Sequence, residues 1–137
     1  MALIGGVDWD DAPEPVQLEA GEYEVRVVSA KLTQNKKVED DGTQGHHVAV
    51  TFAIQNADDP DFNGKEVIHR FSTKRTARFM FLRFLNACGL TAEGLDDYDD
   101  LAGHECKVQV VLRQLPKRDG DTEPRMWPEI QRFIPLA

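Results

Sequence analysis

The sequence lacks the features that mark membrane, secreted and metal-binding proteins. Its longest apolar runs are far shorter than the ~20 residues that a membrane-spanning helix needs. The N-terminal residues show no basic stretch followed by an apolar one, so we expect no secretory signal. The only two cysteines, Cys88 and Cys106, match no metal-binding spacing, and we expect two reduced, half-buried thiols in a cytosolic protein.

The sequence also lacks a coherent set of catalytic residues. His46 and His47 are neighbours on a predicted strand, so their side chains point to opposite faces and cannot share a metal without a bulge. His104 and Cys106 could share a face, but they supply only two ligands. There is no glycine-rich phosphate loop or nucleophile motif, and the acidic segment 95–103 does not match a calcium loop. We therefore expect no enzyme, no metal and no cofactor.

The charge is unevenly distributed along the chain. The formal net charge is −8, yet residues 1–24 hold seven acidic side chains and no Lys or Arg. Residues 25–90 hold ten basic side chains against seven acidic ones, and residues 91–137 hold six against ten. A globally acidic protein does not coat a polyanion indiscriminately, but it can bind one through a local basic groove.

The length of 137 residues suits one domain, and alternating hydrophobicity predicts five strands within it. Residues 1–20 read as an acidic N-terminal arm with Trp9 as its apolar anchor, and residues 21–137 as the domain. Loops are predicted at 33–45 and 56–65, the second containing the tight-turn pair Asn63-Gly64. Pro128 suits an edge strand or a bulge. The expected strands cover residues 21–32, 46–55, 65–72, 104–115 and 126–136.

A helix of about four turns is predicted between the third and fourth strands. Ser72 or Thr73 could cap its start, and Gly89 can end it. Two apolar residues, Phe79 and Leu82, fall within its polar arc. They could pack on the N-terminal arm or form a contact to a second subunit. The opposite face is predicted to be core, with Met80, Phe81, Phe84 and Leu85 as its main residues.

Three strands, one helix and two strands fit a five-stranded OB-fold barrel with the order β-β-β-α-β-β. Five strands of this length cannot bury both faces in a flat sheet. Closing them into a barrel, with the helix plugging one end, would bury the core and remove the sheet edges. An α+β sheet covered by one helix fits the same order.

An OB barrel binds ligands on the face of its second and third strands, between two flanking loops. Those places hold cations that could follow a nucleic-acid backbone and aromatic rings that could stack on bases. The alternative is ordinary surface, because both loops also carry acidic residues and Phe71 or Trp127 could be core. A protein-interaction module, or a mimic of DNA, would also fit the composition. The candidate nucleic-acid-binding residues are Lys36, Lys37, His69, Arg70, Phe71, Lys74, Arg75, Lys107, Arg113, Lys117, Arg118, Arg125 and Trp127.

The order of several segments resembles a phage-encoded family of small OB-fold proteins, often described only as a domain of unknown function and linked to single-stranded DNA binding. The segments are "VDWDDAPEPVQLEAGEYEVRVVSAKLT", "HVAVTFAI", "NGKEVIHRFS", "FLRFLNACGL", "DLAGHECKVQVVLRQ" and "EIQRFIPL". The resemblance covers nearly the whole chain and rests on order and spacing.

This resemblance implies a sequence-tolerant single-stranded DNA-binding protein that acts in phage DNA replication or recombination. Its place would be the cytoplasm of the bacterial host, its partners would include replication or recombination proteins, and it would have no contact with a membrane. The resemblance implies no catalytic residues. The alternative function is an OB-type interaction or assembly module that does not bind DNA, using the acidic arm or the Phe79 and Leu82 pair to form a homo-oligomer.

Overall fold

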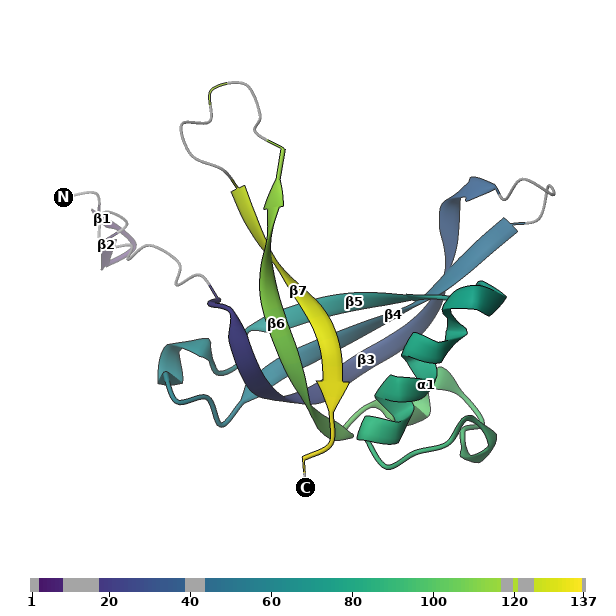
Figure 1. Ribbon diagram of the computed structural model, residues 1–137. Coiled ribbons are helices and arrows are strands. Elements are labelled where there is room, and N and C mark those ends of the chain that lie inside the picture. The colour runs from purple at the N-terminus through teal and green to yellow at the C-terminus, as the bar shows by residue number, and fades with distance from the viewer. Residues whose placement is uncertain (1–2, 9–17, 39–43, 117–119, 121–124, 137) are drawn as a thin grey trace.

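The computed structural model describes residues 3–8, 18–38, 44–116, 120 and 125–136 of the chain. These residues form mostly strands and one α-helix (Figure 1). The predicted order of three strands, a helix and two strands is confirmed for the main sheet. Its elements are β3 (Gly21–Val38), β4 (Gln44–Gln55), β5 (Glu66–Ser72), α1 (Arg78–Ala87), β6 (Glu105–Leu115) and β7 (Arg125–Ile134). Short 3₁₀ helices lie at η1 (Pro60–Phe62), η2 (Arg75–Ala77), η3 (Ala92–Gly94) and η4 (Tyr98–Leu101).

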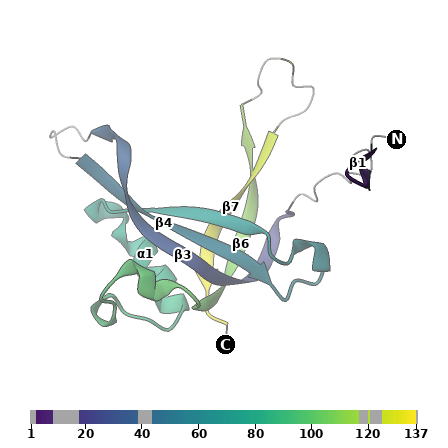
Figure 2. The ribbon, with the colours of Figure 1, turned by 180° about the vertical axis from the view of Figure 1, so that it is seen from behind.

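The main sheet is antiparallel throughout, in the order β5-β4-β3-β6-β7. Strand β3 is central: it pairs with β4 along most of its length, and with β6 only through residues 21–26. A register shift between Val27 and Ser29 interrupts the β3–β4 ladder where the pairing to β6 ends. Such an irregularity bends a strand and increases its twist. The sheet consequently curls, and β7 crosses over the other strands instead of lying flat beside them (Figures 1 and 2).

The sheet is not closed into a barrel, so the predicted OB-fold barrel is not confirmed. Among the described residues, β5 and β7 are the two edges of the sheet and no ladder joins them. Side chains fill the space between these edges: the ring centroids of His69 and Phe133 are 5.5 Å apart, and those of Phe71 and Phe133 are 5.4 Å apart. The backbones of hydrogen-bonded strands lie only about 4.8 Å apart, so these rings could not lie between β5 and β7 if the two strands were paired.

Pro128 lies on β7, which is an edge strand, as its sequence predicted.

The core lies on the concave side of the curled sheet and against α1. The alternation of apolar residues that predicts strands in β4 and β6 corresponds to their buried faces, since Val50, Phe52, Cys106 and Val108 are all fully buried. The rings of Phe52 and Phe84 pack edge to face with centroids 5.3 Å apart, so the helix covers the sheet with its aromatic side.

Helix α1 is shorter than predicted at its start. It begins at Arg78, because Thr73 does not cap it: the Thr73 hydroxyl donates to the backbone oxygen of His46 on β4 at 2.9 Å. At the other end Gly89 has φ +76° and the Leu90 amide donates to the Leu85 carbonyl at 2.8 Å. This is the left-handed termination that glycine favours, and it confirms the predicted end of the helix.

The two faces of α1 also agree with the sequence. Phe84 and Leu85 are fully buried, and Met80 and Phe81 pack partly buried against the core. Phe79 and Leu82 remain outside, with 49% and 52% of their surface exposed. None of the helices in the described ranges is long and apolar enough to span a membrane.

The prediction of a loop at residues 33–45 is wrong over most of that range. Strand β3 continues to Val38 and β4 already begins at Gln44, with Gln34 paired to His46. Polar residues can extend a hairpin because the ladder uses backbone groups, and this end of the hairpin projects from the body (Figure 1).

The N-terminal arm contains regular structure that the sequence pattern did not predict. Strands β1 (Leu3–Ile4) and β2 (Val7–Asp8) form a small hairpin of their own. Gly5 and Gly6 connect them with φ values of +57° and +83°, a turn that glycine makes without strain. The predicted anchor Trp9 lies outside the described residues.

The fold brings Cys88 and Cys106 together, although they are distant in sequence. Both are free thiols, and a side-chain hydrogen bond links them between the end of α1 and β6. Cys88 is half-buried, as expected for both cysteines, whereas Cys106 is fully buried because it lies on the inward face of β6. The hydrogen bond that the Cys106 thiol donates to the Cys88 sulfur, together with burial, raises the pKa of Cys106, so Cys106 stays protonated at neutral pH.

Candidate nucleic-acid interface

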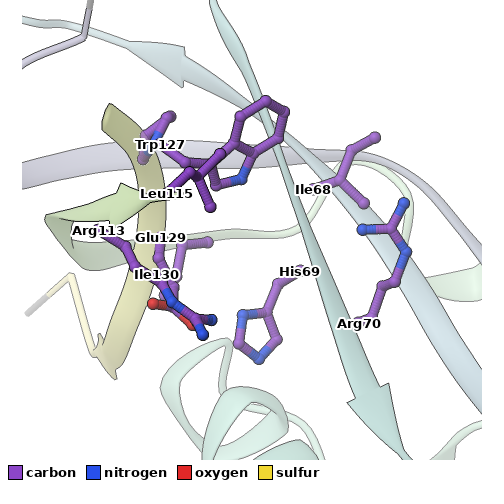
Figure 3. Close-up of a pocket in the computed structure, with 9 residues that line it drawn as sticks. Ile68, His69, Arg70, Arg113, Leu115, Trp127, Glu129 and Ile130 are labelled. Atoms are coloured by element: carbon purple, nitrogen blue, oxygen red, sulfur yellow. The ribbon is translucent and has the colours of Figure 1, made fainter. Parts of the chain in front are cut away.

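A groove of about 500 Å³ lies between the sheet edge β5 and the hairpin β6–β7 (Figure 3). It occupies the place where the two edges of the sheet face each other without pairing. The buried side chain of Ile130 belongs to its lining. The residues around the groove are Ile68, His69 and Arg70 from β5, Arg113 and Leu115 from β6, and Trp127, Pro128, Glu129 and Ile130 from β7.

Trp127 is the largest exposed aromatic residue of the described chain, with 59% of its surface open to solvent. It pairs in register with Arg113 on β6, so the two side chains lie on the same face of the hairpin. Figure 3 shows the indole at the rim of the groove, with Ile68 and Arg70 across from it. An indole that is mostly exposed at a groove offers a flat apolar face to a ligand.

The groove contains two arginines and one carboxylate. Arg113 Nη1 lies 3.9 Å from Glu129 Oε1, with both side chains substantially exposed. An exposed pair at this distance stabilises the fold by less than about 1 kcal/mol, so Arg113 can exchange Glu129 for another anion at little cost. Arg70 is exposed on β5. The groove therefore presents two guanidinium groups, one of them partly neutralised by Glu129.

His69 lines the groove from a more buried position. Its ring lies 4.4 Å from the Phe71 ring and 5.5 Å from the Phe133 ring, measured between centroids. Burial lowers the pKa of His69, and the nearby carboxylate of Glu129 opposes this only in part. His69 is consequently neutral at pH 7, and adds no fixed charge to the groove at that pH.

We expect the stability of the protein to fall as the pH drops below about 6.5, the usual histidine pKa. Because His69 has a lower pKa in the folded chain, the unfolded chain binds the proton first. The loss of stability develops as the pH falls from the pKa of His69 in the unfolded chain to its pKa in the folded chain, and the loss stays constant at lower pH. Urea unfolding at pH 7.5 and 5.5 measures it, and His69→Asn should show a smaller loss than wild type. An equal loss in both proteins would mean that His69 is not its source.

Four of the predicted binding residues meet at the groove: His69, Arg70, Arg113 and Trp127. The prediction for Phe71 is wrong in its role, because Phe71 is only 2% exposed. Its ring stacks on Phe84 within the core, with centroids 5.3 Å apart and planes inclined by 18°. No base could reach it without displacing the helix.

Other predicted residues lie elsewhere. Lys74 and Arg75 are exposed after the end of β5 and do not line the groove. Lys107 pairs with Glu24 in register and belongs to a second groove of about 470 Å³, on the opposite part of the sheet. That groove is rich in carboxylates, so it repels phosphates: its acidic residues are Glu19, Glu22, Glu24, Asp58 and Asp59.

The remaining predicted residues are five cations that were expected to lie in loops. The backbones of Lys36 and Lys37 lie in β3 and that of Arg125 begins β7, but their side chains are outside the description. Lys117 and Arg118 lie outside the described residues altogether. The predicted contribution of these five residues to binding stays a prediction.

Sequence reasoning missed Ile68, Leu115, Pro128, Glu129 and Ile130 as groove residues. The alternation of side chains between the two faces of a strand could have identified Ile68 and Glu129. Ile68 alternates with the inward Val67 and so shares a face with Arg70, and Glu129 shares a face with Trp127. Ile68 is 49% exposed, an apolar residue on an outward position.

Among the described residues, no group of three or more His, Cys, Asp or Glu side chains could hold a metal ion. Comparison of the chain with protein-family models and with curated proteins finds no match.

Proposed function

We propose that this protein binds single-stranded DNA, with little preference for sequence, through the groove between β5 and the β6–β7 hairpin. One observation supports this most: an indole that is 59% exposed lies in an open groove beside Arg70 and Arg113, in a chain whose net charge is −8. Stacking on an aromatic ring and cations along a backbone are the two interactions that single-strand binding uses.

The composition of the groove favours a single strand over a duplex. Trp127 needs the open face of a base, and duplex bases are stacked on each other. Ile68 and Leu115 add apolar surface next to the indole, which suits contact with bases better than contact with phosphates. The two arginines would then hold phosphates on either side of the stacked base.

We further propose that the sheet is an OB-fold barrel left open between β5 and β7. The antiparallel strand order supports this, as does the position of α1 after the third strand of the sheet. The far ends of the β3–β4 and β6–β7 hairpins project from the same side of the body (Figure 1). Loops at these two positions flank the ligand surface of OB folds.

The biological setting that we propose follows from the sequence resemblance. The protein would protect or organise single-stranded DNA during phage replication or recombination, in the cytoplasm of a bacterial host and alongside other replication or recombination proteins. The exposed groove supports the DNA-binding part of this proposal alone.

The test is a titration of labelled oligo-dT with the full chain, followed by fluorescence anisotropy at low and high salt. We expect binding at low salt whose log K falls with log salt, with a slope of about −0.7 for each phosphate contacted. A duplex of the same length serves as the comparison and should bind more weakly. No binding at low salt would exclude the proposed function and would favour an assembly module that does not bind DNA.

A further inference from the structure

One exposed apolar surface of the molecule lies on its most basic element. Phe79 and Leu82 are 49% and 52% exposed and lie three residues apart on α1, so they adjoin on one face of the helix. The guanidinium of Arg83 lies over the Phe79 ring, 4.9 Å from its centroid. We call these three residues the α1 patch. Residues 73–90 around it contain four Lys or Arg and no acidic residue.

A second exposed apolar surface lies in the most acidic segment. In the β1–β2 hairpin, Leu3, Ile4 and Val7 are 57%, 71% and 51% exposed. Residues 1–24, which include this hairpin, contain seven acidic side chains and no Lys or Arg. Ile4 and Val7 pair in register and share one face, while Leu3 lies on the other. A two-stranded hairpin is marginally stable by itself in water, so a surface that covers the face of Ile4 and Val7 would stabilise it.

We propose that the β1–β2 hairpin of one copy binds the α1 patch of a second copy, and that the exchange is mutual. The two surfaces complement each other, because their apolar residues lie in sequence segments of opposite charge. The overall charge of −8 would make two copies repel, and this contact places the most acidic segment of one copy against the most basic segment of the other.

The positions of the two surfaces favour a second copy over the same chain. The hairpin and α1 lie at opposite sides of the body in both views (Figures 1 and 2). Leu18 is only 5% exposed and belongs to the core, so the chain that follows the hairpin is fixed to the body at this residue. In a two-fold exchange the small contact forms twice, which compensates for its limited area.

The test measures the mass of the full chain by light scattering and sedimentation, over a range of concentrations and at two salt concentrations. We expect a dimer whose dissociation rises with salt. The double changes Phe79→Ser with Leu82→Ser, and Leu3→Ser with Ile4→Ser, should each weaken dimerisation at least tenfold. Val28→Ser with Leu32→Ser is the matched control, because it removes two residues of β3 that are 45% and 44% exposed and should leave the dimer intact.

Mixing the two weakened variants gives the sharpest result. One variant keeps an intact hairpin and the other an intact α1 patch, so a mixture should form heterodimers held by one of the two contacts. A helix-to-helix dimer would instead survive the Leu3 and Ile4 changes, and a hairpin bound within its own chain would leave wild type monomeric. Either result, or a mixture that associates no more strongly than each variant alone, would overturn the proposal. Neither Phe79 nor Leu82 lines the groove, so replacing them should leave DNA binding unchanged. A failure of the proposed dimer can therefore be distinguished from a failure of the proposed function.

Discussion

Replacing Trp127 with alanine is expected to weaken the binding of oligo-dT by about 5- to 150-fold, which corresponds to ~1–3 kcal/mol for one stacked base. Trp127 is 59% exposed at the rim of the groove and contributes little to the core, so the fold should not change. Anisotropy titration at low salt measures the loss, and circular dichroism and thermal unfolding check that the variant remains folded.

Two further variants make the Trp127 result specific. Trp127→Phe keeps an aromatic face and should retain most of the affinity. Trp9→Phe leaves Trp127 as the only tryptophan, since the chain has two, and its fluorescence should then be quenched on adding oligo-dT. If Trp127→Ala binds as tightly as wild type while DNA binding itself is present, the strand follows another surface, and the groove is not its site.

Replacing Phe84 with alanine is expected to lower the free energy of unfolding by about 3–5 kcal/mol. Phe84 is fully buried, and its ring lies 5.2 to 5.3 Å from the rings of Phe52, Phe71 and Phe133, which come from three different strands. The truncation leaves a cavity where the helix meets the sheet. Such a loss is a large part of the ~5–15 kcal/mol that stabilises a typical domain. Urea unfolding measures it as a lower midpoint.

Phe79→Ala is the control on the same helix. Phe79 is 49% exposed, so its loss should change the free energy of unfolding by no more than about 0.5 kcal/mol. This comparison uses a concentration at which wild type is monomeric, so that a subunit contact does not contribute. Similar effects of the two changes would contradict the assignment of the inner and outer faces of α1.

Local patterns in the sequence predicted the parts of the fold that depend on neighbours in the chain. Alternation located all five main strands and the buried faces of β4 and β6, because successive side chains of a strand point to opposite faces. The helical period separated Phe84 from Phe79, and Gly89 correctly predicted the end of α1. The same reasoning failed for residues 33–38, where polar composition suggested a loop and backbone pairing with β4 formed a strand.

The candidate site was predicted only in part, because it depends on contacts between distant strands. Arg113 and Trp127 were identified as cations and aromatics of the right type, and the register of β6 with β7 places them on one face. By residue type alone, Phe71 is as good a candidate for stacking on a base as Trp127, yet Phe71 lies in the core. Its neighbours, Phe84 and Phe133, come from α1 and β7, and the only hint within the strand itself is that Phe71 shares its face with the inward Val67.

The sequence by itself determined the order of the elements, the faces of the helix and the division between acidic arm and mildly basic centre, since each depends on residues that are close in the chain. Tertiary structure alone decided that the sheet stays open between β5 and β7, that Lys107 lies among carboxylates, and that Cys88 meets Cys106. The physical reason is the curl of β3: it sets which strand edges and side chains approach each other, and this depends on packing against residues that are remote in sequence.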